Sequence, residues 1–154
     1  MEYEVLTKSA HGVSQNTYHM IWVTKYRYPT FEGEGMAKLC RNLIEVAAKK
    51  HDIEVFECKV MKDHVHVFVR LPRTMSVAKA FQLLKGYTSY KIRKMQTWRR
   101  KYKALWSSFT FSRTVGSVTG GVIDHYIRES NTTGQYGLQK SLKQFAGQAM
   151  VPRP

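Results

Sequence analysis

Two histidines in the stretch Lys62–Leu71 have the spacing that a metal site needs. His64 and His66 are separated by one residue, and the valines that alternate with them are typical of a β-strand. On a strand, residues i and i+2 point to the same face and lie roughly 6–7 Å apart at the backbone. Two imidazoles at that separation suit one metal ion. The alternative is a pair of strand histidines on a solvated face, and the spacing alone leaves it open.

The charge of the chain indicates a polyanionic partner. The 154 residues include 25 Lys and Arg against 11 Asp and Glu, so the net charge is +14. Such an excess suits nucleic acid, with an anionic membrane surface as the alternative. No segment reaches the run of about 18 apolar residues that spans a bilayer, and the acidic start of the chain lacks the layout of a signal peptide. We therefore expect a soluble, cytoplasmic protein without a membrane partner.

Cysteine content supports the same compartment. Only Cys40 and Cys58 are present, too few for a disulfide framework or a cysteine-based zinc site. Both are expected to be buried as small apolar side chains.

The elements that must position the histidines follow the order β–α–β–β–α–β and then a further helix. Apolar periodicity and turn residues predict strands at about 17–27, 53–61, 64–71 and 109–118, and helices at about 35–51, 77–95 and 122–130. Thr74 or Ser76 can cap the second helix. Residues 1–15 are expected to form an arm, and residues 131–154 a polar tail. The simplest packing is an α+β, ferredoxin-like arrangement, a four-stranded antiparallel sheet with two helices on one face.

Two groups of basic residues are candidates for contact with DNA phosphates. The first is a basic and aromatic cluster at the end of the first strand, with Lys25, Tyr26 and Arg27. The second lies on the helix at 77–95, where almost every charge has the same sign, so opposite-charge pairs cannot explain it. The residues of this helix that we expect to contact DNA are Lys85, Lys91, Arg93 and Lys94. The alternatives are an amphipathic strand end and the ordinary solvated face of a helix.

These features together resemble the single-tyrosine transposases of the HUH nuclease superfamily. The resemblance extends over residues 16–130, which would be the core of one domain covering residues 1–154. The segments that carry it are Tyr18–Arg27, Met61–His66, Leu105–Trp106, Thr114–Gly116 and Asp124–Ile127.

The resemblance implies a metal-dependent single-strand DNA endonuclease and strand transferase. Within it, His64 and His66 correspond to the HUH pair, which would bind Mg²⁺ or Mn²⁺, and Tyr126 corresponds to the nucleophile on a C-terminal helix. Attack on single-stranded DNA would give a 5′-phosphotyrosine and a free 3′-hydroxyl. The chemistry is consistent, because a phenol is a weak nucleophile at neutral pH and needs a cation to polarise the phosphate.

One position departs from the family pattern. The family places Gln, the third metal ligand, four residues after the tyrosine, where this chain has Ser130. Glu129 lies one residue earlier on the Tyr126 side of the helix, and its carboxylate suits a hard cation. Glu129 is therefore the expected third ligand, with a water molecule or an ordinary surface glutamate as the alternatives.

The resemblance also implies a homodimer that recognises DNA hairpins at the ends of a mobile element, in which the tyrosine helix of one subunit can complete the histidine pair of the other. Three other functions stay open on the sequence. They are a domesticated, repeat-associated HUH nuclease, a hairpin-binding protein with impaired catalysis, and an RNA-recognition module on the same fold.

Overall fold

The computed structural model describes residues 7–95 and 104–115. The chain divides into two units, and the unit formed by Glu4–Ser117 contains all the helices and strands named below. Their bounds, in chain order, are β1 Thr7–Ser9, β2 Gly12–Ser14, β3 Thr17–Thr24, η1 Lys25–Arg27, α1 Glu34–Lys50, β4 Glu54–Val60, β5 His64–Arg70, α2 Val77–Arg93 and β6 Trp106–Thr114.

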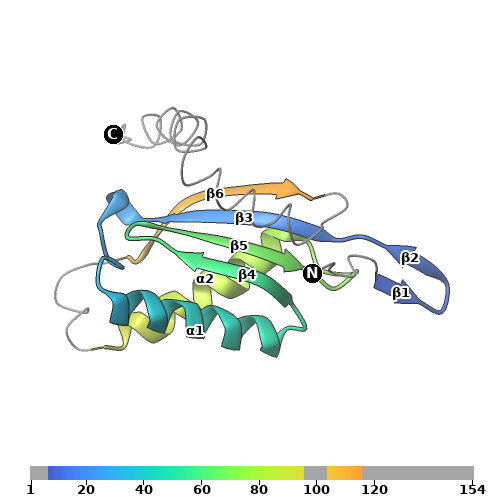
Figure 1. Ribbon diagram of the computed structural model, residues 1–154, viewed down its shortest axis with the longest axis horizontal. Coiled ribbons are helices and arrows are strands. Elements are labelled where there is room, and N and C mark those ends of the chain that lie inside the picture. The colour runs from blue at the N-terminus through green and yellow to red at the C-terminus, as the bar shows by residue number, and fades with distance from the viewer. Residues whose placement is uncertain (1–6, 96–103, 116–154) are drawn as a thin grey trace. The chain divides into compact units, whose positions relative to one another are not determined.

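The four longer strands form one antiparallel sheet in the order β4-β5-β3-β6 (Figure 1). The first and third strands of the βαββαβ unit lie at its centre, as the ferredoxin-like arrangement requires. The α+β core is thereby confirmed. The predicted helix at 122–130 and the tail at 131–154 lie outside the described residues.

Both helices cover one face of the sheet (Figure 1). Alternation along β5 explains why, since Val65, Val67 and Val69 point to this face and are completely buried in the core. Ile44 of α1 and Leu84 of α2 pack into the same core, each with no exposed surface. Burial of apolar surface of this kind stabilises the fold by about 25 cal/mol for each Å² removed from water.

Helix α2 begins where its capping residue predicts. The Ser76 hydroxyl oxygen accepts a hydrogen bond from the Lys79 backbone N–H at 3.2 Å, so Ser76 rather than Thr74 is the cap. The helix ends at Arg93, slightly before the predicted end at Met95, whose side chain is exposed. At its centre, Thr88 accepts a hydrogen bond from Trp106 Nε1 at 2.9 Å, which fastens α2 to β6.

Three predicted strand boundaries were wrong, one of them the end of the last strand, which was predicted at Val118 and lies at Thr114. The strand predicted to reach Arg27 ends at Thr24, because the Thr24 hydroxyl donates to the Tyr28 carbonyl oxygen at 2.8 Å and closes a turn. The strand predicted to start at Phe109 starts at Trp106, which pairs with Thr24 and is buried. Trp106 precedes the segment in which apolar and polar residues alternate. The alternation therefore did not show that the strand had already begun.

The amino-terminal segment is more ordered than the predicted arm. Strands β1 and β2 form a hairpin, with Ser9 opposite Gly12. Asn16 then ties the chain to the end of β5, since its side-chain amide donates to the Pro72 carbonyl oxygen at 3.0 Å. A short hairpin of polar residues lacks the long alternation that would have predicted it.

The cysteines agree with a simpler expectation. Cys40 and Cys58 are both buried free thiols, as predicted. Neither α1 nor α2, within the described part of the chain, has the length and apolar character needed to cross a bilayer.

Candidate metal and DNA site

His64 and His66 lie together on the sheet face opposite the two helices. Their ring centroids are 4.9 Å apart and the ring planes are inclined by 68°. The strand period predicted this juxtaposition, and the geometry confirms it. His64 is partly exposed, whereas His66 is buried, with only 8% of its surface exposed. One imidazole is therefore at the surface and the other is in the sheet.

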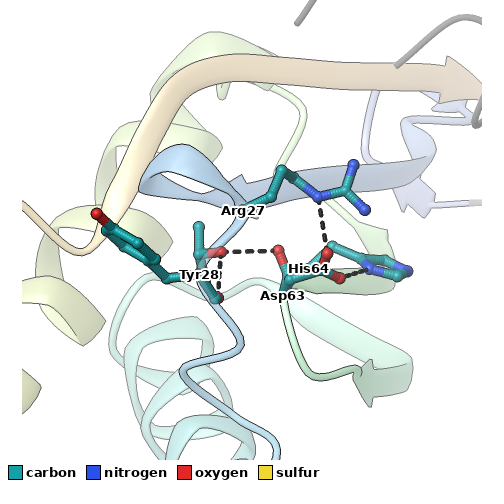
Figure 2. Close-up of polar contacts among 5 residues, drawn as sticks. Arg27, Tyr28, Asp63 and His64 are labelled. Atoms are coloured by element: carbon teal, nitrogen blue, oxygen red, sulfur yellow. Dashed lines mark hydrogen bonds and ion pairs between the residues drawn. The ribbon is translucent and has the colours of Figure 1, made fainter. Parts of the chain in front are cut away.

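A chain of polar contacts fixes the orientation of His64 (Figure 2). Its Nδ1 lies 2.7 Å from Asp63 Oδ1, and the other oxygen of that carboxylate, Oδ2, accepts from Arg27 Nε at 2.9 Å. A carboxylate on Nδ1 selects the tautomer that carries its proton there. The Nε2 of His64 then keeps its lone pair for an external ligand.

The turn that supplies Arg27 has a strained backbone. Tyr26 and Arg27 have φ values of 57° and 56°, in the left-handed region that side chains with a Cβ rarely adopt. Thr24 holds the turn in place, because its backbone N–H donates to the Asp63 carbonyl oxygen at 2.9 Å, and its hydroxyl oxygen, which donates to Tyr28, also lies 3.1 Å from that carbonyl oxygen. Strain of this kind persists where surrounding contacts over-determine the conformation.

The electrostatics keep Asp63 ionised. Burial raises the pKa of its carboxyl, but hydrogen bonds from His64 and Arg27 together with the Arg27 charge lower it to about 2. The carboxylate therefore carries its charge at neutral pH and can polarise the ring of His64.

His66 has a different partner, His19 of β3. The Nε2 of His19 lies 3.1 Å from the Nδ1 of His66. Burial lowers the pKa of His66 to about 3, with smaller contributions from the charges of His64, His19 and Lys59. Burial, aided by Arg113, also lowers the pKa of His19 to about 4. Both rings are therefore neutral at pH 7, which is the form that binds metals.

The two imidazoles of His64 and His66 are side chains of the kind that bind a metal ion. Within residues 7–95 and 104–115, no group of three or more His, Cys, Asp or Glu side chains is arranged to hold a metal. The pair would therefore supply two ligands, and Glu129, the expected third ligand, lies outside the described residues, as does the expected nucleophile Tyr126. Both expected ions, Mg²⁺ and Mn²⁺, bind oxygen ligands readily, so the two imidazoles do not by themselves select one of them.

The cluster predicted at Lys25, Tyr26 and Arg27 divides between two roles. Tyr26 is 64% exposed, and Lys25 Nζ lies 5.3 Å from the centre of its ring. Tyr28 lies beside Tyr26 in an edge-to-face contact, so the turn presents two aromatic rings and a cation. Arg27 uses its Nε on Asp63, and its contact with DNA stays a prediction.

The second basic group lies on the other side of the sheet from the histidine pair. Lys91 and Lys94 are exposed on α2, and their amino groups lie over the rings of Tyr87 and Tyr90 at 5.5 and 4.4 Å. Arg93 is also exposed. The structure thus does not bring this group to His64.

Lys85 differs from its neighbours on α2. Its Nζ donates to the Ser107 carbonyl oxygen at 2.8 Å, and burial lowers its pKa. The side chain supports the contact between α2 and β6, and its role in DNA binding stays a prediction.

Sequence reasoning missed Asp63 and His19 as parts of the site. An acidic residue directly before a candidate ligand histidine was a usable signal, since carboxylates commonly orient metal-binding imidazoles. No comparable local signal marked His19, because its contact with His66 depends on the pairing of two strands.

The comparison with protein families decides which family this site belongs to. The family model described as "Transposase IS200 like" matches residues 12–130, more than three quarters of the chain. The chain belongs to the IS200-like transposase family. The resemblance to single-tyrosine transposases is thereby confirmed, and membership implies an enzyme that cleaves and joins DNA.

Individual relatives match along most of their length. The ISDra2 transposase TnpA of Deinococcus radiodurans is 28% identical over 141 residues, covering 85% of this chain and 98% of the relative. The transposase of insertion sequence element IS200 from Salmonella typhimurium is 26% identical over 144 residues, covering 86% and 88%.

Two solved structures share the fold. A crystal structure of a candidate transposase from Deinococcus radiodurans superposes with a TM-score of 0.65 at 24% identity, covering 80% of this chain and 96% of the other. A REP-associated tyrosine transposase bound to a REP hairpin gives a TM-score of 0.53 at 15% identity, covering 77% and 68%. Both likenesses bear on the fold of the chain.

Proposed function

We propose that this transposase nicks and rejoins single-stranded DNA through a covalent link to Tyr126, assisted by a divalent ion at His64 and His66. The observation that carries the proposal is the histidine pair itself. The two rings lie 4.9 Å apart on one sheet face, and His64 Nδ1 is held by Asp63. A histidine oriented by a carboxylate on its Nδ1, beside a second imidazole, is suited to a metal centre.

The covalent step balances without an external energy source. The Tyr126 oxygen attacks phosphorus, a P–O bond to Tyr126 forms, and the bond from phosphorus to the 3′ oxygen breaks. The products are a 5′-phosphotyrosine and a free 3′-hydroxyl. A second 3′-hydroxyl then attacks the same phosphorus and releases Tyr126, so strands are rejoined without ATP. A bound metal would polarise the phosphate and stabilise the charge that develops on it.

The residues of the chain have separate tasks in this scheme. His64 and His66 would hold the ion, which is Mg²⁺ or Mn²⁺, and Glu129 is the proposed third ligand from the helix that carries Tyr126. Asp63 accepts a hydrogen bond from His64 Nδ1, which leaves the Nε2 of His64 for the ion. The partly exposed Lys25 and the exposed Tyr26 lie on the same turn as Arg27, where they would contact the DNA backbone and a base.

The proposed substrate is a DNA hairpin with a single-stranded flank. The REP-associated relative in the solved complex is bound to a REP hairpin. In this chain, the net charge of +14 and the exposed cations of α2 suit such a polyanion. We also propose a cytoplasmic homodimer as the active form, on the family resemblance.

A hairpin-binding protein with impaired catalysis is the second candidate. Ser130 favours it, because serine occupies the position where the family has its glutamine ligand. A domesticated nuclease of repeated hairpins is the related third form, and the REP-bound structure is the observation that favours it.

The deciding experiment is covalent trapping. Wild-type protein is incubated with a labelled library of single-stranded hairpin oligonucleotides, in Mn²⁺ or in EDTA, and separated on a denaturing gel. Tyr126→Phe and His64→Ala are the test variants, and His51→Ala, which removes an exposed histidine at the end of α1, is the matched control.

We expect a metal-dependent protein–DNA band in the wild type and the control that is absent from both test variants. Sequencing the trapped DNA then gives the target. Tight hairpin binding without any adduct in Mn²⁺ would overturn the catalytic proposal and favour the impaired binder, with Ser130→Gln as the variant expected to restore the adduct.

A further inference from the structure

His19 is held in contact with the more buried histidine of the pair. It lies on β3 opposite Phe68, and its ring stacks on the Phe68 ring with centroids 4.4 Å apart and planes inclined by 2°. The His19 and His66 centroids are 5.3 Å apart. His19 is only 2% exposed, so packing limits its ring to this position.

The contact between the two rings needs one proton. His19 Nε2 and His66 Nδ1 are 3.1 Å apart, so one nitrogen donates and the other accepts. If His66 Nδ1 accepted, the single proton of the neutral His66 ring would be on Nε2, and neither nitrogen would have a lone pair for a metal. If His66 Nδ1 donates, Nε2 keeps its lone pair.

We propose that His19 is a positioning residue. Its Nε2 accepts a hydrogen bond from His66 Nδ1–H and so holds His66 in the tautomer that presents Nε2 to the metal. This inference rests on the proposed metal site at His64 and His66. It gives each member of the pair its own acceptor on Nδ1, a carboxylate for His64 and an imidazole for His66.

The geometry speaks against His19 as a third ligand. Its Nε2 is directed to His66 Nδ1, and the His19 and His66 rings are close to parallel, with planes inclined by 19°. Within the described part of the chain, no group of three His, Cys, Asp or Glu side chains, these histidines included, is arranged to hold a metal. An acceptor behind a ligand histidine commonly affects metal affinity by 10- to 100-fold without touching the metal.

Two substitutions of His19 distinguish the effect of its hydrogen-bond acceptor from the effect of its aromatic ring. His19→Phe keeps a flat ring to stack on Phe68 but removes the acceptor. His19→Gln loses the ring but can place a carbonyl oxygen near the position of Nε2. Each variant is compared with the wild type by thermal unfolding, and Mn²⁺ affinity is measured without DNA from the electron paramagnetic resonance signal of the free ion.

We expect His19→Phe to weaken Mn²⁺ binding by about 10- to 100-fold and His19→Gln to stay within a few-fold of the wild type. A second readout needs no metal. In ¹⁵N-correlated NMR spectra of metal-free wild type, His66 is expected as the Nδ1–H tautomer, and in His19→Phe it is expected to shift towards the Nε2–H form.

Several outcomes would overturn the inference, and they are distinguishable. Wild-type Mn²⁺ binding that is lost in His64→Ala but unchanged in His19→Phe would leave the metal site intact and remove the role of His19. An Nε2–H tautomer of His66 in the wild type would do the same even if His19→Phe failed to fold. Absence of Mn²⁺ binding in the wild type would overturn the metal site and, with it, this role.

Discussion

The carboxylate of Asp63 accepts a hydrogen bond from His64 Nδ1, with 2.7 Å between the two atoms. The same carboxylate is ion-paired with Arg27, so its charge is retained although the side chain is mostly buried. A ligand histidine backed by an ionised carboxylate is a more basic and better oriented ligand than an isolated one. This relationship makes Asp63 a test of the metal site that does not alter either ligand.

Replacing Asp63 is expected to weaken metal binding. Asp63→Ala removes the acceptor from His64 Nδ1, and we expect a 10- to 100-fold loss of Mn²⁺ affinity in a titration without DNA. Arg27→Ala leaves the carboxylate on His64 and is expected to have a smaller effect. Glu45→Ala, which breaks the exposed pair with Arg41, is the control. Equal affinity in Asp63→Ala and the control would contradict the expectation.

The exposed cations of α2 are expected to contribute to DNA affinity through counterion release. Lys91→Ala and Lys94→Ala should each reduce the slope of log affinity against log salt by about 0.7–0.9 if each amino group neutralises one phosphate. Hairpin binding is measured by fluorescence anisotropy at several salt concentrations. Lys38→Ala, on the exposed side of α1, makes the same change in charge, and a reduction as large in this control would indicate a field effect instead of local contacts.

The buried hydrogen bond between α2 and β6 is expected to contribute to stability. Thr88 accepts from Trp106 Nε1 and donates to the Leu84 carbonyl oxygen. Thr88→Val leaves the indole N–H buried without this partner and should lower the free energy of unfolding by about 1–3 kcal/mol. Thr88→Ser keeps the hydroxyl and should lose less in urea unfolding. If Ser and Val were equally destabilising, the lost hydroxyl contact would not be the cause.

A substitution at the C-terminal end of α1 is expected to increase the stability of the protein. Asp52 has a φ of 54° directly after the helix, and Ile53 N–H closes the helix end on the Ala48 carbonyl oxygen at 2.9 Å. Glycine is preferred at this left-handed position, and an acidic side chain is unfavourable at a helix C-terminus. Asp52→Gly should therefore stabilise the protein by about 1 kcal/mol in urea unfolding. Asp52→Asn removes only the charge, so an identical gain there would assign the effect to electrostatics.

The buried thiols are expected to make stability fall at high pH. Burial raises the pKa of Cys58 to about 12 and raises that of Cys40 well above its ordinary value of 9.0. Between pH 9 and 12 the unfolded chain loses these protons while the folded chain keeps them, so stability decreases as pH rises. The expected slope is about 1.4 kcal/mol per pH unit for each thiol. Urea unfolding at pH 8–11 should show a smaller slope in Cys58→Ala, and an unchanged slope would contradict this.

The local parts of the site were predictable, and the long-range parts were not. His64 and His66 could be paired from the sequence because a strand places every second side chain on one face. Arg27 was predicted to contact DNA, yet it binds Asp63, which is 36 residues away in the chain. The turn that allows this contact contains no glycine or proline at its left-handed positions, so local propensity predicted a continuing strand.

By itself, the sequence determined the α+β class, the ferredoxin-like order of elements, the family and the histidine pair. These depend on apolar periodicity and on residues that are adjacent in the chain. Only the tertiary structure decided that His19 reaches His66, 47 residues along the chain, and that Asp63 joins Arg27 to His64. The register between β3 and β5 places those groups within hydrogen-bond distance, and register follows from the packing of the whole sheet against its helices.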